Sequence, residues 1–128
     1  MRYKLSAPAT LHTTIQLPAS KSISNRALIL HALAQGHIAP SNLSDCDDTR
    51  VMIKALDGNP GHIDILAAGT AMRFLTAYLS VTPDTRIITG TERMQQRPIR
   101  ILVDALRELG AQTVSYTHLR AHETPEHL

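Results

Sequence analysis

The residues best suited to chemistry lie near the start of the chain, in the stretch Ser20-Lys21-Ser22-Ile23-Ser24-Asn25-Arg26. This stretch follows Pro18 and opens into a helical pattern that Gly36 ends. The first turn of a helix has backbone N–H groups without partners and about half a positive charge. Ser22 and Arg26 share a helix face because they are four residues apart. Hydroxyl, ammonium and guanidinium groups at such a point favour an anionic ligand, either a phosphate or a carboxylate.

A simpler explanation of the same stretch is that Ser22 or Ser24 caps the helix while the two cations point into solvent. For an isolated Ser-Lys-Ser sequence this would be the better explanation. The density of hydrogen-bond donors in seven residues, without a carboxylate among them, favours the anion site instead.

Two further helix starts carry groups of the same kind. Gly69 and Arg73 repeat the spacing of Ser22 and Arg26 after another short strand pattern, which makes a weak internal repeat. A glycine lets a ligand approach the backbone, although a tight turn alone would also explain it. Arg97 lies just before a proline typical of a first helical turn. A cation is unfavourable at a helix start unless an anion joins it, so Arg97 is a candidate ligand-binding residue.

Length and composition restrict the class of protein. A chain of 128 residues with 43% hydrophobic content is expected to form at most one domain with a real core. A net charge of +2 and 3% aromatic residues argue against a nucleic-acid partner. A single cysteine excludes an intrachain disulfide and fits a reducing compartment. The sequence shows no signal peptide or membrane-length apolar run, so we expect a cytoplasmic protein without a membrane partner.

The hydrophobic spacing predicts mixed α/β structure. Short strands are expected at residues 3–5, 14–17, 38–43, 62–66 and 85–89, and helices at 22–35 and 99–109, with further helices after Asp48 and after Gly69. Asp47 or Asp48 is expected to cap the second helix rather than to bind a divalent metal. The predicted buried faces are Ile23, Ala27, Leu30 and Ala34 in the first helix, Val51, Met52, Ala55 and Leu56 in the second, and Leu102, Ala105, Leu106 and Leu109 in the last.

Four sequence blocks, in order, resemble the enolpyruvyl transferases, and within that family its 5-enolpyruvylshikimate-3-phosphate synthase branch. The blocks are residues 17–27, Asp47-Asp48-Thr49-Arg50, Ala68-Gly69-Thr70-Ala71-Met72-Arg73, and Gln96-Arg97-Pro98-Ile99 followed by residues 102–106. Together the resemblance covers about residues 5–111. It implies an α/β fold built from βαβαββ repeat units, an inverted α/β barrel-like arrangement that is incomplete in this chain.

The resemblance also implies a reaction, in which the enolpyruvyl group of phosphoenolpyruvate is transferred to the 5-hydroxyl of shikimate 3-phosphate. In the family, the lysine that matches Lys21 is catalytic and contacts both substrates. The family residues that match Ser22 and Arg26 bind shikimate 3-phosphate. The residues that match Gly69 and Arg97 bind phosphoenolpyruvate. No cofactor or metal is implied, and full-length members are usually monomeric.

Two other functions remain open. One is the related UDP-N-acetylglucosamine enolpyruvyl transferase, which has Ser-Lys-Asn-Ala at the lysine and a cysteine in the loop before the arginine. This chain has Ser22 after the lysine and no cysteine in residues 90–96, so the shikimate branch fits better. The other is a non-catalytic phosphate-binding module.

The chain departs from the family in three places. Ala67 and Phe74 replace an asparagine and a proline that many members have around Gly69, and residues 49–68 are short for the family. From about residue 113 the pattern is lost. We therefore divide the chain into N-terminal strands (1–17), the first part of a substrate-binding α/β domain (18–112) and an atypical tail (113–128), for which a non-native origin is our hypothesis. On this interpretation the chain is an N-terminal fragment that is inactive alone.

Overall fold

The computed structural model describes residues 1–58 and 60–114, and these contain both helices and strands. In chain order the elements are α1 (Lys21–Leu33), α2 (Asp47–Leu56), β1 (His62–Asp64), α3 (Gly69–Leu79), β2 (Ile87–Thr89), α4 (Glu92–Gln95) and α5 (Arg100–Glu108). The predicted mixture of helix and strand is therefore confirmed. The short helix α4 was not predicted, because its four residues are too few to show a helical hydrophobic period.

The strands β1 and β2 form a parallel pair, with Ile63 aligned with Ile88. Parallel strands need a crossover connection, and α3 supplies it. The residue after β1, Ile65, continues the pairing because its N–H donates to the Thr89 carbonyl at 2.8 Å. The start of α3 and the loop after β2 therefore lie at the same edge of the sheet.

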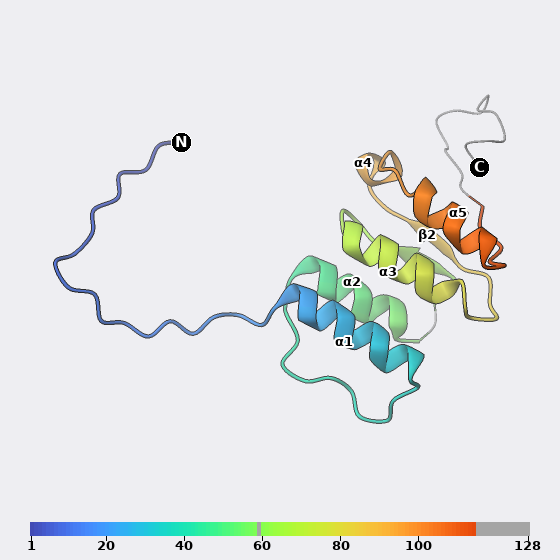
Figure 1. Cartoon of the computed structure of the whole chain (residues 1–128), viewed down its shortest axis with the longest axis horizontal. Coiled ribbons are helices and arrows are strands. Elements are labelled where there is room, and N and C mark those ends of the chain that lie inside the picture. Colours follow the sequence, from blue (N-terminus) through green and yellow to red (C-terminus); the bar gives the residue numbers. More distant parts are fainter. Residues whose placement is uncertain (59, 115–128) are drawn as a thin grey trace.

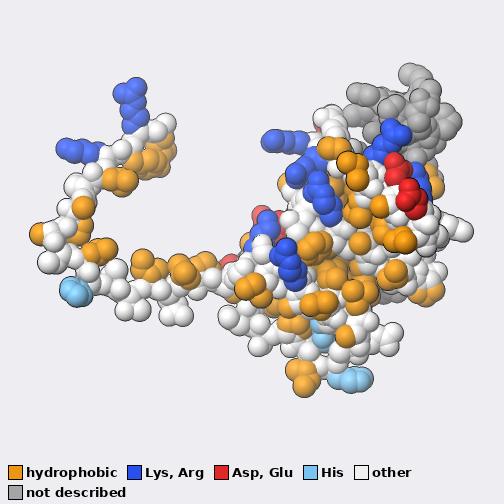
Figure 2. Space-filling model, viewed as in Figure 1, with side chains coloured by type: hydrophobic (Ala, Val, Ile, Leu, Met, Phe, Trp, Pro, Cys, Tyr) orange, Lys and Arg blue, Asp and Glu red, His pale blue; other side chains and the backbone are white. Residues whose placement is uncertain are grey.

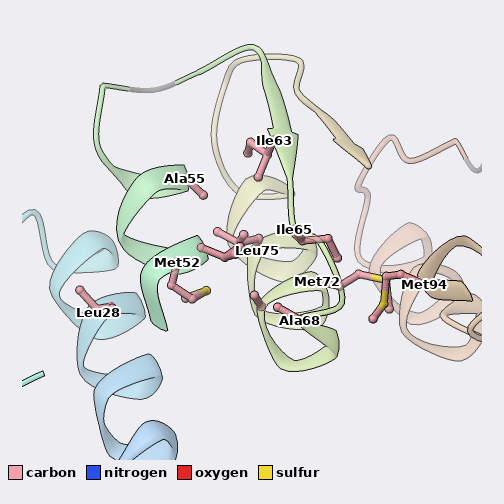
Figure 3. Close-up of a cluster of buried hydrophobic side chains, with 11 residues drawn as sticks. Leu28, Met52, Ala55, Ile63, Ile65, Ala68, Met72, Leu75 and Met94 are labelled. Atoms are coloured by element: carbon pink, nitrogen blue, oxygen red, sulfur yellow. The ribbon is translucent and has the colours of Figure 1, made fainter. Parts of the chain in front are cut away.

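Helices α1, α2 and α3 lie side by side with their N-terminal ends on the same side of the molecule (Figure 1). Their facing sides and the sheet enclose one apolar core (Figure 3). Met52 of α2 and Leu75 of α3 are fully buried in it, and Met94 of α4 closes it beside Met72. The predicted inward face of α2 is confirmed, with Leu56 partly buried at its edge.

The strands predicted at residues 3–5, 14–17 and 38–43 are absent. Residues 1–18 are exposed throughout and run as an extended segment away from the body (Figure 1). A strand requires a partner for its N–H and C=O groups, and β1 and β2 pair with each other in the described sheet. The apolar pattern in these three segments was therefore not sufficient to form a strand. The domain division itself stays a prediction.

The predicted buried face of α1 is wrong. Ile23 is 71% exposed and Leu30 is 65% exposed, whereas Ser24, Asn25 and Leu28 are buried. Two hydrogen bonds to neighbouring segments fix this rotation. The Ser44 N–H donates to Ser24 Oγ at 2.8 Å and the Thr49 hydroxyl donates to Asn25 Oδ1 at 2.9 Å. Since buried polar groups need partners, these contacts outweigh the apolar stripe on the opposite face.

The last helix also turns a different face inward. Val103 is its buried residue, and Leu109 is 86% exposed. Leu102 and Leu106 are partly buried, whereas Ala105 is exposed. The predicted face was therefore right in part, at Leu102 and Leu106, and wrong at Ala105 and Leu109.

Candidate anion-binding site

The N-terminus of α1 is capped by the residue that directly precedes the helix. The Ile23 N–H donates to Ser20 Oγ at 3.3 Å, so the cap is Ser20 and not Ser22 or Ser24. Arg26 folds back along the same turn, and its guanidinium donates to the Ser22 carbonyl at 3.1 Å. The Arg26 Cζ atom also lies 5.9 Å from the centre of the Phe74 ring of α3, within the range of a cation–π contact.

Lys21 does not point freely into solvent. Its ammonium forms an ion pair with the Asp48 carboxylate at the start of α2. This hydrogen bond and the negative charge of Asp48 raise the pKa of Lys21 above its ordinary value of 10.5, although the lysine side chain remains 47% exposed. The ammonium is therefore charged at any physiological pH and tethered to the neighbouring helix.

Asp48 does not cap its own helix, and this part of the prediction is wrong. The N-cap of α2 is Cys46, which makes no side-chain capping hydrogen bond. Asp48 Oδ1 instead accepts the Ala71 N–H of α3 at 3.3 Å, while its other oxygen meets Lys21. The N-terminal turns of α1, α2 and α3 consequently meet at one carboxylate.

Gly69 and Arg97 are in direct contact. A Cβ atom on Gly69 would overlap Nη1 of Arg97 and would lie 3.5 Å from Nη1 of Arg73. Arg73 in turn donates to the Gly69 carbonyl at 3.3 Å. Two guanidinium groups therefore lie at the first residue of α3. The absence of a side chain at Gly69 provides the space that the Arg97 guanidinium occupies.

The structure thus brings the predicted site residues to neighbouring helix starts. Lys21 connects through Asp48 to the first turn of α3, where Gly69 and Arg97 lie, and Arg26 contacts α3 through Phe74. Ser22 is exposed on the first turn of α1. Figure 2 shows lysine and arginine side chains gathered on the side of the body where these helices begin. This concentration of cations and helix N-termini can bind anionic groups such as phosphate and carboxylate.

Asp48 and Arg73 were not among the site residues predicted from the sequence. Both stood within recognised motifs, and Arg73 repeated the position of Arg26. For Asp48 the sequence shows an aspartate in the first turn of a helix. Such a residue can cap its own helix or contact a neighbouring one, and the sequence does not distinguish the two. In the described part of the chain there is no cluster of three or more His, Cys, Asp or Glu residues that could hold a metal ion.

Comparison with known proteins gives the family. A family model described as EPSP synthase (3-phosphoshikimate 1-carboxyvinyltransferase) matches residues 5–58 and 59–122. The chain belongs to the EPSP synthase family. A 3-phosphoshikimate 1-carboxyvinyltransferase of Bacteroides fragilis is 77% identical over 111 residues, which are 87% of this chain and 27% of that protein. Proteins of the same name from Hamiltonella defensa and Klebsiella pneumoniae are 39% and 42% identical, over 90% and 81% of this chain.

The chain spans about a quarter to a third of the length of these EPSP synthase relatives, from 27% for the Bacteroides protein to 32% for the Hamiltonella protein. The family match reaches residue 122 and so enters the predicted tail at 113–128, of which residues 115–128 lie outside the described structure. Among the described residues, every helix is too short or too polar to cross a membrane.

Proposed function

We propose that this chain forms part of the substrate site of a 3-phosphoshikimate 1-carboxyvinyltransferase, which transfers the enolpyruvyl group of phosphoenolpyruvate to shikimate 3-phosphate. The observation that carries the proposal is the contact of Arg97 with Gly69, at the helix start to which Asp48 also ties Lys21. Both substrates are anions, and phosphate and carboxylate groups are what such a site recognises. Membership of the EPSP synthase family supports this choice of reaction.

Each site residue receives a role under this proposal. Lys21 is the catalytic residue and contacts both substrates, since a lysine ammonium can neutralise charge on either side. Ser22 and Arg26, exposed at the start of α1, bind shikimate 3-phosphate. The backbone at Gly69 and the guanidinium of Arg97 bind phosphoenolpyruvate. The transfer involves no redox change, and we propose that it needs no cofactor and takes place in the cytoplasm.

We further propose that the described residues are an incomplete βαβαββ unit within a longer parent enzyme. The unit β1–α3–β2 is parallel and has two strands, fewer than such a repeat requires. The exposed apolar residues Ile23, Leu30 and Leu33 on α1 support this, because the remaining length of a full-length relative offers chain that could cover them. Apolar side chains on the surface over α1 are visible in Figure 2.

A chimera tests the proposed function. The matched 111 residues of this chain would replace the corresponding segment of the Bacteroides fragilis relative, and phosphate release from phosphoenolpyruvate would be measured with shikimate 3-phosphate present. We expect turnover within about tenfold of the relative. We expect none from the 128-residue chain alone, because on this proposal the rest of the parent enzyme supplies groups for proton transfer. A folded but inactive chimera would refute the proposed function.

A non-catalytic phosphate-binding module is the second candidate. The observation that favours it is the closed core, in which Met52, Ile65 and Leu75 are fully buried without any further chain. On this alternative the 128-residue chain alone would bind shikimate 3-phosphate as tightly as the chimera does. Isothermal titration of both proteins with shikimate 3-phosphate separates the two candidates, since the enzyme proposal expects much weaker binding by the chain alone.

A further inference from the structure

Three helix N-termini share one side chain, and that side chain is Asp48. One of its carboxylate oxygens pairs with the Lys21 ammonium of α1 and the other accepts the Ala71 N–H of α3. The Asp48 and Lys21 side chains differ in how firmly each is held. The Asp48 side chain is 11% exposed and held at both oxygens, whereas the Lys21 side chain is 47% exposed on a flexible four-carbon stem.

The capping pattern shows why Asp48 has this position. The N-cap of α3 is Ala68, which has no side chain able to accept a hydrogen bond, so α3 takes its cap from α2. The carboxylate that reaches α3 for this purpose also lies within reach of Lys21. The same group therefore caps one helix and sets the direction of the lysine on another.

We propose that Asp48 is a positioning residue that holds the Lys21 ammonium beside the N-terminal turn of α3, the turn whose first residue, Gly69, contacts Arg97. This inference rests on the proposed function, because it assigns Asp48 a role in the same site. A lysine without this tether samples many rotamers, and an anion that binds it must then order the side chain. With the tether, that cost is met during folding, and the ammonium already lies where the anion arrives.

The opposing effect is charge repulsion, since a carboxylate near the site disfavours an anionic ligand. Both Asp48 oxygens are engaged by donors, and Lys21 neutralises the charge. Positioning is therefore expected to be the larger effect. The two effects have opposite signs when Asp48 is replaced, so one measurement distinguishes them.

The experiment compares Asp48→Asn with Asp47→Asn in the active chimera. Asparagine retains an oxygen for the Ala71 N–H and removes the charge that holds Lys21. Asp47 is the matched control, because it lies in the same helical turn and is exposed. We expect Asp48→Asn to raise KM for phosphoenolpyruvate about tenfold, in keeping with the freedom of an untethered lysine. Asp47→Asn should leave it unchanged.

The pH profile adds a readout that a purely structural role would not move. The acidic groups facing Lys21 are Asp48 of α2, whose hydrogen bond and charge do most to raise the pKa of Lys21, and Cys46 before it, whose thiolate form raises it further. The other charged groups at these helix starts are the guanidinium groups of Arg26, Arg73 and Arg97. In Asp48→Asn the alkaline limb of kcat/KM for phosphoenolpyruvate should therefore move to lower pH.

A double-mutant cycle with Lys21→Met shows whether Asp48 acts through Lys21. Asp48→Asn should have little further effect on phosphoenolpyruvate binding once Lys21 is methionine. Unchanged or tighter binding in Asp48→Asn, an unmoved alkaline limb, or additive effects in the cycle would each overturn the positioning role. So would loss of folding in Asp48→Asn. An inactive wild-type chimera would instead refute the proposed function itself, so the two failures are distinguishable.

Discussion

The N-terminal turns of α1 and α3 share one hydrogen-bonding pattern but are capped in different ways. In each, an arginine donates to the carbonyl four residues earlier, Arg26 to Ser22 at 3.1 Å and Arg73 to Gly69 at 3.3 Å. Helix α1 is capped by the adjacent Ser20, whereas α3 follows Ala68 and takes its cap from Asp48 of another helix.

This difference indicates how each start would meet a ligand. At α1 the Ser20 side chain satisfies the Ile23 N–H, and the charged side chains of Lys21 and Arg26 lie beside this capped turn. At α3 the first residue has no side chain, and an arginine from a distant segment occupies the space beside it. The first site would recognise an anion by side chains, and the second by close approach to the backbone together with a guanidinium.

Lys21→Met is expected to have the largest effect, because Lys21 belongs to α1 and is connected to α3 through Asp48 of α2. Binding of both phosphoenolpyruvate and shikimate 3-phosphate should weaken by about 2–3 kcal/mol each, the scale of a lost charge-assisted contact. Isothermal titration of the chimera measures both affinities. Lys54→Met is the control, since Lys54 is exposed in the last turn of α2. If only one ligand were affected, Lys21 would not connect the two helix starts.

Arg97→Ala should affect one ligand alone. Phosphoenolpyruvate binding should weaken by about 2–3 kcal/mol because a charge-assisted contact at Gly69 is lost. Shikimate 3-phosphate binding should change little. Arg93→Ala serves as the control, because Arg93 is exposed on α4 nearby in sequence. Equal losses for both ligands would remove the proposed division between the α1 and α3 starts.

Gly69→Ala tests the space at the start of α3. The new methyl group would displace the Arg97 guanidinium, which is the flexible end of a long side chain, so the fold should tolerate the change. Phosphoenolpyruvate affinity is expected to fall by about 1–2 kcal/mol, and stability should change by less than about 1 kcal/mol. Titration and urea denaturation measure the two quantities.

Gly61→Ala is the matched control for Gly69→Ala, because nothing lies within 4 Å of the position its Cβ would take. It should change neither affinity nor stability. A large loss of stability in Gly69→Ala alone would mean that the glycine is required by the fold rather than by the ligand.

The smallest expected effect is the contribution of the Lys21–Asp48 pair to stability at high pH. The pKa of Lys21 is raised in the folded state, so this contribution is complete below about pH 10.5 and is lost as the pH rises through the raised value. The half-exposed lysine limits the change to less than about 1 kcal/mol. Urea denaturation of the wild type and of Lys21→Met, each below and above pH 10.5, separates the contribution of this ion pair from that of other titrating groups. A difference between the two proteins that grows above pH 10.5 would contradict the sign.

Much of this protein followed from the sequence alone. The positions of α2, α3, β1, β2 and α5 were predicted within a few residues, because hydrophobic period, glycine and proline act locally. The same local signals predicted Lys21, Arg26, Gly69 and Arg97 as anion-binding residues, and that role stays a prediction.

Only the tertiary structure decided which groups meet. The rotation of α1 was set by the Asn25–Thr49 and Ser24–Ser44 hydrogen bonds, and the apolar stripe that suggested the opposite face lies exposed. The partners of Asp48 come from two other helices, 27 residues before it for Lys21 (48 − 21) and 23 residues after it for Ala71 (71 − 48). Periodicity describes one helix at a time, so it cannot assign contacts that form only when helices pack together.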